Sequence, residues 1–398
     1  MGRIIEFTAM RKCFVLFLTA ALLLVSHGAG AKGFDIVYGP WIQNVTETEF
    51  TVMWTTEGKS LSWVEVAPDD GTPFEAAQRP RYYQTIAGKR FTGTFHTVRI
   101  AGLEPGKSYR YRILGKEVVD DSDPYGSIYG KEATLRLIGT VKTLDHAADT
   151  CRFSMVNDIH DDASKYISLV GPVKGRPVDF LLLNGDIVSY ATSIDTVIRH
   201  TFDPVSDIIK DVPVVFARGN HEGRGADSYR ISGLFKTPTG EFYYIFRQGP
   251  VAFVVLDGGE DKPDSSVEYS GLADYDSYRQ TELEWLREAV KDPLFAEAPV
   301  KVAVCHIPLI DNTSSWYSQA WLARNFTPVL NEAGVDLMLS GHLHRHVYVE
   351  AGECGNGFPI VVNDNKSRLD FRAVAGQILI DIYDMSGTKV KSYTFDIE

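Results

Sequence analysis

From residue 151 onward, the chain repeats short runs in which nearly every residue is apolar. A strand with one solvent-exposed face alternates polar and apolar residues, whereas wholly apolar runs fit strands that are buried on both faces. Helices usually cover such sheets, and Ser277 to Val290 carries Leu283, Leu286 and Val290 at helical spacing. We therefore expect an α/β domain over residues 151–398. The runs are 180–183, 212–216, 251–256, 300–304 and 335–339, with further strands expected at 358–362, 377–382 and 390–395.

Residues 33–145 follow a different pattern. Polar and apolar residues alternate over 50–54, 63–66 and 96–100, and Gly, Pro and Asp turns separate these stretches. Short alternating strands at this spacing predict a small all-β sandwich. We expect His96 and His146, in or near this domain, at its surface.

The N-terminus has the layout of a secretory signal. Arg11 and Lys12 precede an apolar run over 13–25, and the small residues Ala29-Gly30-Ala31 follow. The alternative interpretation is a membrane anchor, but the apolar run is short for one. We expect residues 1–31 to be a signal peptide cleaved near Ala31, leaving no membrane span. The mature protein would then be secreted or periplasmic.

Charge narrows the choice of partners. The formal net charge is −12 over 398 residues. An acidic surface repels the phosphate backbone, so we expect no nucleic-acid partner. A small phosphorylated substrate remains possible, because bound metal ions can dominate the local field. The sequence makes no prediction about oligomeric state. Cys151 and Cys305 adjoin apolar runs and are predicted to be buried free thiols.

Polar side chains of metal-ligand type follow each buried run. The carboxyl ends of strands in an open α/β sheet meet at one crevice, so we expect these side chains to gather there. Five of the ten histidines lie at such positions, which is hard to explain by core packing. The candidates are Asp158, His160, Asp186, Asn220, His221, His306, His342 and His344.

Oxygen and imidazole ligands suit Fe, Zn or Mn ions. A carboxylate can bridge two such ions, and a pair roughly 3.5–4 Å apart can hold the attacking and leaving oxygens of an in-line displacement. Water bound between them serves as hydroxide near neutral pH. The residue types are therefore compatible with two divalent or trivalent metal ions.

The motifs follow one another in the order Asp-x-His, Gly-Asp, Gly-Asn-His-Glu, His, Gly-His-x-His. This order resembles that of the calcineurin-like metallophosphoesterase superfamily, over roughly residues 151–350. Residues 33–145 resemble a fibronectin type III domain, and more closely the N-terminal domain of purple acid phosphatases. That second resemblance rests on residues 38–44, 51–54 and 103–109. Together they imply a two-sheet αββα sandwich behind a small β-sandwich.

The resemblance also implies roles at the site. One ion would take Asp158, His160 and His344, the other Asn220, His306 and His342, and Asp186 would bridge them. His221 would bind no metal; it would donate a proton to the leaving oxygen or steady the phosphoryl charge.

One position departs from the pattern of purple acid phosphatases. Those enzymes supply a tyrosine three residues after the bridging aspartate, where this chain has Ser189 followed by Tyr190. We therefore expect no purple iron–tyrosinate band.

Arg218, Arg224 and His346 each have two possible interpretations. Arg218 and Arg224 could grip phosphate oxygens, or could hold their loop through an ion pair, with Glu222 as one partner. His346 could line the substrate pocket or make an ordinary hydrogen bond. Tyr269, Tyr275 and Tyr278 could cap that pocket. For the front domain we favour a structural role over substrate recognition.

The expected function is metal-dependent hydrolysis of phosphate esters by a bridging hydroxide, and we favour a phosphomonoesterase. A phosphodiesterase or nucleotide hydrolase using the same site is the alternative. A non-catalytic extracytoplasmic binding protein is less favoured, because every ligand position is filled. A secreted nuclease would need a basic groove, which the acidic composition disfavours.

Overall fold

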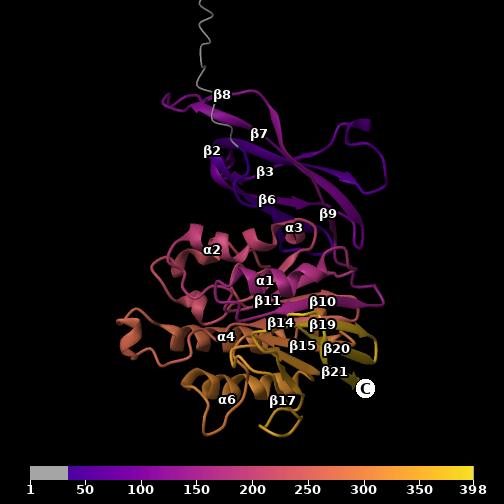
Figure 1. Cartoon of the computed structure of the whole chain (residues 1–398), viewed down its shortest axis with the longest axis vertical. Coiled ribbons are helices and arrows are strands. Elements are labelled where there is room, and N and C mark those ends of the chain that lie inside the picture. The colour runs from indigo at the N-terminus through magenta and orange to yellow at the C-terminus, as the bar shows by residue number, and fades with distance from the viewer. Residues whose placement is uncertain (1–34, 398) are drawn as a thin grey trace, which may run out of the picture. The chain divides into compact units, whose positions relative to one another are not determined.

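The computed structural model describes residues 35–397, apart from the side chains of residues 136–138. The expected signal peptide, residues 1–31, lies outside the described residues. Across the described range, no helix combines the length and the apolar character that a bilayer crossing requires. Figure 1 shows the arrangement of the elements.

One sheet of the α/β region has three parallel strands at its centre. Strands β10 (Cys151–Val156), β11 (Phe180–Asn184) and β12 (Val214–Ala217) lie side by side in that order. Three antiparallel strands extend the sheet beyond β10: β19 (Ser367–Val374), β20 (Gln377–Asp384) and β21 (Lys389–Asp396).

The second sheet has the strand order β13-β14-β15-β16-β18-β17. Its four central strands are parallel and its two edge strands are antiparallel to their neighbours. The strands are β13 (Tyr244–Gln248), β14 (Val251–Leu256), β15 (Val300–Cys305), β16 (Leu337–Ser340), β17 (Val347–Val349) and β18 (Ile360–Val362).

The two sheets pack face to face, and helices cover the outer face of each (Figure 1). Strand β14 shows why its run is wholly apolar: Phe253 points into the core between the sheets, whereas Val254 packs with Leu283 beneath the helices. The first sheet is covered by α1 (Ala163–Val170), α2 (Ile194–Thr201) and α3 (Ser206–Ile209), and the second by α4 (Tyr275–Ala289), α5 (Pro293–Ala296) and α6 (Tyr317–Glu332). Short 3₁₀ turns lie at 74–76, 171–173, 203–205, 221–223, 228–233 and 267–269.

The N-terminal region is all-β, with its own core around Trp54, Val64 and Tyr111. Strand β1 pairs in parallel with β12 through Gln43 and Val214, so the strands of the N-terminal region continue the first sheet. An αββα sandwich behind an all-β region is the predicted fold class, which is thus confirmed. The strands are β1 (Trp41–Gln43), β2 (Glu49–Pro68), β3 (Arg81–Tyr83), β4 (Thr85–Ile86), β5 (Lys89–Arg90), β6 (Gly93–Ala101), β7 (Ser108–Asp120), β8 (Ile128–Tyr129) and β9 (Ala133–Lys142).

His96 corrects one expectation. It lies on the inward face of β6 and is buried, with its ring stacked on Trp54 at 5.1 Å and its Nε2 3.0 Å from Ser60 Oγ. The prediction of a surface position was wrong because alternation alone does not show which face of an isolated strand turns inward. His146 is partly exposed and lies beside Glu47. Cys151 and Cys305 are buried free thiols, as expected.

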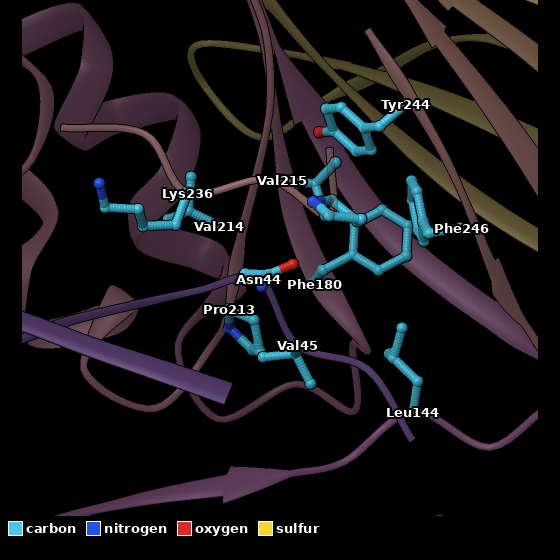
Figure 2. A pocket seen from close by; sticks show the side chains of 11 residues that line it. Asn44, Val45, Leu144, Phe180, Pro213, Val214, Val215, Lys236, Tyr244 and Phe246 are labelled. Atoms are coloured by element: carbon cyan, nitrogen blue, oxygen red, sulfur yellow. The ribbon is translucent and has the colours of Figure 1, made fainter. Parts of the chain in front are cut away.

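A small apolar cavity of about 30 Å³ lies at the amino ends of β11 and β12 (Figure 2). Phe180 and Val214, the first residues of those strands, line it together with Asn44 and Lys236. It has room for about one water molecule. The polar loops follow the opposite, carboxyl ends of the same strands, so this cavity is separate from them.

Candidate metal centre

Five parallel strands direct their carboxyl ends to one place, and the candidate side chains follow those ends. Strands β10, β11, β12, β15 and β16 end at residues 156, 184, 217, 305 and 340, one to three residues before the first candidate of each loop. The structure brings eight of the residues singled out in the sequence into mutual contact: Asp158, His160, Asp186, Asn220, His221, His306, His342 and His344.

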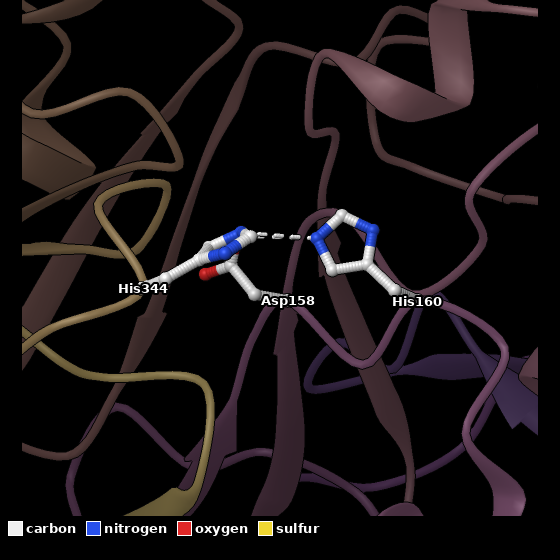
Figure 3. Close-up of side chains that lie close together, drawn as sticks. All are labelled: Asp158, His160 and His344. Carbon is white, nitrogen blue, oxygen red and sulfur yellow. Dashed lines mark hydrogen bonds and ion pairs between the residues drawn. The ribbon is translucent and has the colours of Figure 1, made fainter.

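The first grouping contains Asp158, His160 and His344, whose potential ligand atoms all lie within 4.8 Å of one another. The Nε2 atoms of the two imidazoles face each other at 3.0 Å, and His344 Nε2 lies 3.1 Å from Asp158 Oδ1 (Figure 3). Two imidazole nitrogens and a carboxylate oxygen that converge in this way form a ligand set for a borderline metal ion.

The second grouping contains Asp186, His306 and His342. His306 Nε2 lies 3.2 Å from Asp186 Oδ2, and His342 Nδ1 lies 3.0 Å from Asn220 Oδ1. Asp186 also groups with His160 and His221, each with Nε2 3.9 Å from Asp186 Oδ2. Asp186 therefore lies between the two sets, where a bridging carboxylate would be needed.

Two atoms of these groupings are buried without a hydrogen bond of good geometry among the described residues. They are Asp158 Oδ1 and His306 Nε2, on side chains with no exposed surface. Leaving a buried polar atom without a partner costs about 1–3 kcal/mol. A cation at this point would satisfy both atoms, so the donor set fits a metal ion.

The backbone is strained at the same place. Nine non-glycine residues in the described range have a positive φ, and five of them are candidate ligands. Such a conformation costs about 1–3 kcal/mol per residue and persists only where the surroundings hold it. The five are Asp158, His160, Asp186, His342 and His344, with φ between 52° and 71°.

Two glycines allow the loops to meet. A Cβ on Gly219 would lie 2.2 Å from Asp186 Oδ1, and one on Gly185 would lie 2.6 Å from His306 Nδ1. Any side chain at these positions would displace a candidate ligand. The glycines of the Gly-Asp and Gly-Asn-His-Glu motifs are thus required by close approach.

Burial and charge set the protonation of the site. Burial alone would raise the pKa of Asp186, but His306 and His221 hold it below its usual range. Burial would lower the pKa of His306, but Asp186 and Asp158 raise it to about 10. Burial lowers the pKa of His160 and of His342 to about 4, which favours the neutral imidazole that binds metal.

Glu222 ties the loops after β11 and β12 together, a role the sequence did not suggest. Its buried carboxylate accepts hydrogen bonds from the backbone N–H groups of Asp186 (2.9 Å), Ile187 (2.8 Å) and Gly219 (3.0 Å). Its position beside His221 in the motif was the only available signal. Asn157 acts similarly on the first loop, where its Nδ2 donates to Asp158 Oδ2 at 2.6 Å.

His221 is held so that one ring nitrogen faces the two groupings. Its Nδ1 lies 3.0 Å from the Ser189 carbonyl oxygen, which can only accept, so Nδ1 carries a proton. Its Nε2 lies 2.9 Å from Arg224 Nη1. Arg224 is in turn anchored on Glu260 by two contacts of 2.8 and 2.9 Å. Arg224 therefore contacts His221 while it forms an ion pair with Glu260, and the ion-pair partner of Arg224 is not Glu222.

Arg218 and His346 lie outside the two groupings. Arg218 is buried and pairs with Asp257 at 2.7 Å, which favours the loop-holding interpretation, with Asp257 in place of Glu222. His346 Nε2 lies 2.6 Å from the hydroxyl oxygen of Tyr393, so it makes an ordinary hydrogen bond. Both partners are distant in sequence and come from other elements.

Family models match both regions of the chain. Residues 151–346 match the calcineurin-like phosphoesterase domain, and residues 40–127 match the purple acid phosphatase N-terminal domain. The comparison with curated protein sequences gives no significant match.

One solved structure shares the fold of this chain at low sequence identity. The purple acid phosphatase PPD1 from yellow lupin (Lupinus luteus) seeds is 16% identical with a TM-score of 0.63; the alignment covers 91% of this chain and 74% of that one. GAP50, described as the anchor in the inner membrane complex of Plasmodium, is 13% identical over 63% of this chain and 90% of its own, with a TM-score of 0.43. The two domain matches and the gathered motif residues agree: the chain carries a calcineurin-like phosphoesterase domain over residues 151–346, preceded by a purple acid phosphatase N-terminal domain over residues 40–127.

Proposed function

We propose that this protein is a metal-dependent phosphomonoesterase with two metal ions in its active site. The observation that carries the proposal is the pair of ligand groupings with Asp186 between them. Asp158, His160 and His344 would hold one ion, and Asn220, His306 and His342 the other. Asp186 would bridge the two, which would be Fe, Zn or Mn ions.

Two bound ions would lower the pKa of a water molecule and hold the attacking and leaving oxygens in line. The protein's own residues prepare the rest. Glu222 fixes the backbone beside Asp186, and Ser189 orients the His221 ring through Nδ1. Arg224 Nη1–H can only donate, so His221 Nε2 accepts a hydrogen bond in this arrangement. To donate a proton to the leaving oxygen, His221 would have to release Arg224 and take up a proton at Nε2. Arg224, anchored on Glu260, adds positive charge beside that nitrogen.

The proposed substrate is a small phosphorylated molecule outside the cytoplasm. The basic, apolar and small segments of residues 1–31 support the extracytoplasmic location. The acidic net charge supports a small substrate over nucleic acid.

The test is hydrolysis of p-nitrophenyl phosphate and bis-p-nitrophenyl phosphate by the purified protein, with Mn, Zn or Fe added. We expect metal-dependent turnover of the monoester that is lost in Asp186→Asn and kept in Asp149→Asn, a change at an exposed aspartate outside the motifs. Preference for the diester would replace the monoesterase assignment with a phosphodiesterase. Absence of turnover together with absence of bound metal by elemental analysis would refute the proposal and favour a binding protein.

A further inference from the structure

A cavity of about 1100 Å³ opens beside His221. Tyr190 and Arg224 line it, and both contact His221. The Tyr190 ring lies edge-on to the imidazole at 6.2 Å, and Arg224 Nη1 lies 2.9 Å from its Nε2. Two residues of the cavity lining therefore contact the imidazole of His221. A phosphoryl group at the metal centre would leave the rest of its ester directed towards this space.

The lining of the cavity is rich in tyrosine. Some of these rings are fixed, since the hydroxyl of Tyr278 bonds Asp257 at 2.8 Å and that of Tyr269 bonds Glu260 at 3.0 Å. Others remain turned to solvent: Tyr190 is 55% exposed and Tyr229 is 78% exposed. Large exposed apolar side chains gathered around one hollow mark a binding site. The lining tyrosines are Tyr190, Tyr229, Tyr269, Tyr275 and Tyr278.

The charges of the lining argue against a second phosphate there. Its cations already have carboxylate partners: Arg218 pairs with Asp257, Arg224 with Glu260, and Lys262 with Asp261. Two further carboxylates, Glu268 and Asp274, add negative charge to the lining. An anionic leaving group would be repelled, whereas an uncharged aromatic group could stack on the tyrosines.

We infer that this cavity binds the uncharged aromatic leaving group of the phosphomonoester substrate, with Tyr229 and Tyr190 against its faces. The inference rests on the proposed phosphomonoesterase activity and adds the class of ester. A nucleoside and a simple aryl group share this chemistry, and two substrate pairs distinguish them.

The first pair is adenosine 5′-monophosphate and ribose 5-phosphate, which leave through the same primary alkoxide oxygen and differ by the base. The second pair is 1-naphthyl and phenyl phosphate, which both leave as aryl oxides and differ in ring area. We expect kcat/KM to favour the larger aromatic member of at least one pair. Preference in the first pair identifies a nucleoside, and preference in the second alone identifies a simple aryl group. Equal values in both pairs would overturn the inference and leave the proposed activity standing.

Tyr229→Ala supplies the matched variant. Loss of one aromatic contact, worth about 1 kcal/mol, should lower the preference about fivefold. Tyr125→Ala removes a tyrosine that is 98% exposed in the front domain and should leave the preference unchanged. An unchanged preference in Tyr229→Ala would remove this residue from the inferred site and contradict the inference.

A binding measurement separates this inference from the proposed activity. Adenosine and 1-naphthol lack the phosphoryl group, so saturation-transfer NMR with the full protein detects the cavity alone. We expect binding of at least one compound, weakened in Tyr229→Ala and unchanged in Tyr125→Ala. If no ester is hydrolysed, the proposed activity fails while this measurement still decides the cavity's role. Absence of binding by both compounds overturns the inference.

Discussion

Replacing Glu222 with alanine removes the acceptor that joins the loops after β11 and β12. Three backbone N–H groups, of Asp186, Ile187 and Gly219, would lose hydrogen bonds of 2.8–3.0 Å. The carboxylate is buried, so water reaches these groups only if the site opens. Each unsatisfied buried donor costs about 1–3 kcal/mol, and partial entry of water reduces the sum. We expect Glu222→Ala to lower the free energy of unfolding by about 3–6 kcal/mol.

The assay is equilibrium unfolding in urea with and without added metal. Because Asp186 and Asn220 sit on the two loops that Glu222 joins, metal affinity should also fall, by about 10–100-fold. Glu222→Gln keeps one carbonyl oxygen and should lose less stability than Glu222→Ala. Glu284→Ala, at an exposed position of α4, is the control and should change stability by less than about 0.5 kcal/mol.

The reasoning would be refuted by a small effect. If Glu222→Ala changes the free energy of unfolding by less than about 1 kcal/mol, the three hydrogen bonds do not hold the loops together. If stability falls but metal affinity does not, Glu222 supports the fold without positioning the candidate ligands.

Three further outcomes follow from the same structure. Gly219→Ala places a Cβ 2.2 Å from Asp186 Oδ1 and should abolish metal binding, measured by elemental analysis, whereas Gly233→Ala meets no atom within 4 Å and should bind normally. Burial lowers the pKa of His96 from 6.5 to about 4, so the unfolded chain binds more protons between those values. Stability should therefore fall by up to about 3 kcal/mol as the pH drops from 6.5 to 4, and His96→Gln should flatten this part of a urea-unfolding pH series. Removing metal with a chelator should lower stability by about 2.7 kcal/mol relative to protein with free metal at 100 times its Kd, seen as a lower Tm that returns when metal is added.

The positions of the candidate ligands could be predicted from the sequence because their signals are local. Each one follows a wholly apolar run, and the carboxyl ends of parallel strands meet at one edge whatever the loops do. Asp158 and Asp186 are examples: the strand before each one and the residue type were enough to place both at the same crevice. The class of fold followed in the same way, from the change between alternating and wholly apolar runs.

The partners of the remaining side chains depended on tertiary structure. Arg218 reaches Asp257 and Arg224 reaches Glu260, across 39 and 36 positions of the chain respectively. Hydrophobic periodicity does not indicate which distant side chains form ion pairs. The sequence analysis therefore named Glu222 as a possible partner, whereas the Glu222 carboxylate accepts hydrogen bonds from backbone N–H groups. The burial of His96 could not be predicted from the sequence either, since alternation distinguishes the two faces of a strand but does not show which face packs against the core.

The cavity beside His221 shows the same division. The sequence marked Tyr269, Tyr275 and Tyr278 as residues that could cap a pocket, but Tyr190 and Tyr229 come from other loops and join them only after folding. Strand ends follow from the local hydrophobic pattern and the chain direction, so the residues of the candidate metal centre could be predicted from the sequence. The shape of the neighbouring cavity depends on how separate loops pack against one another, and only the tertiary structure determines it.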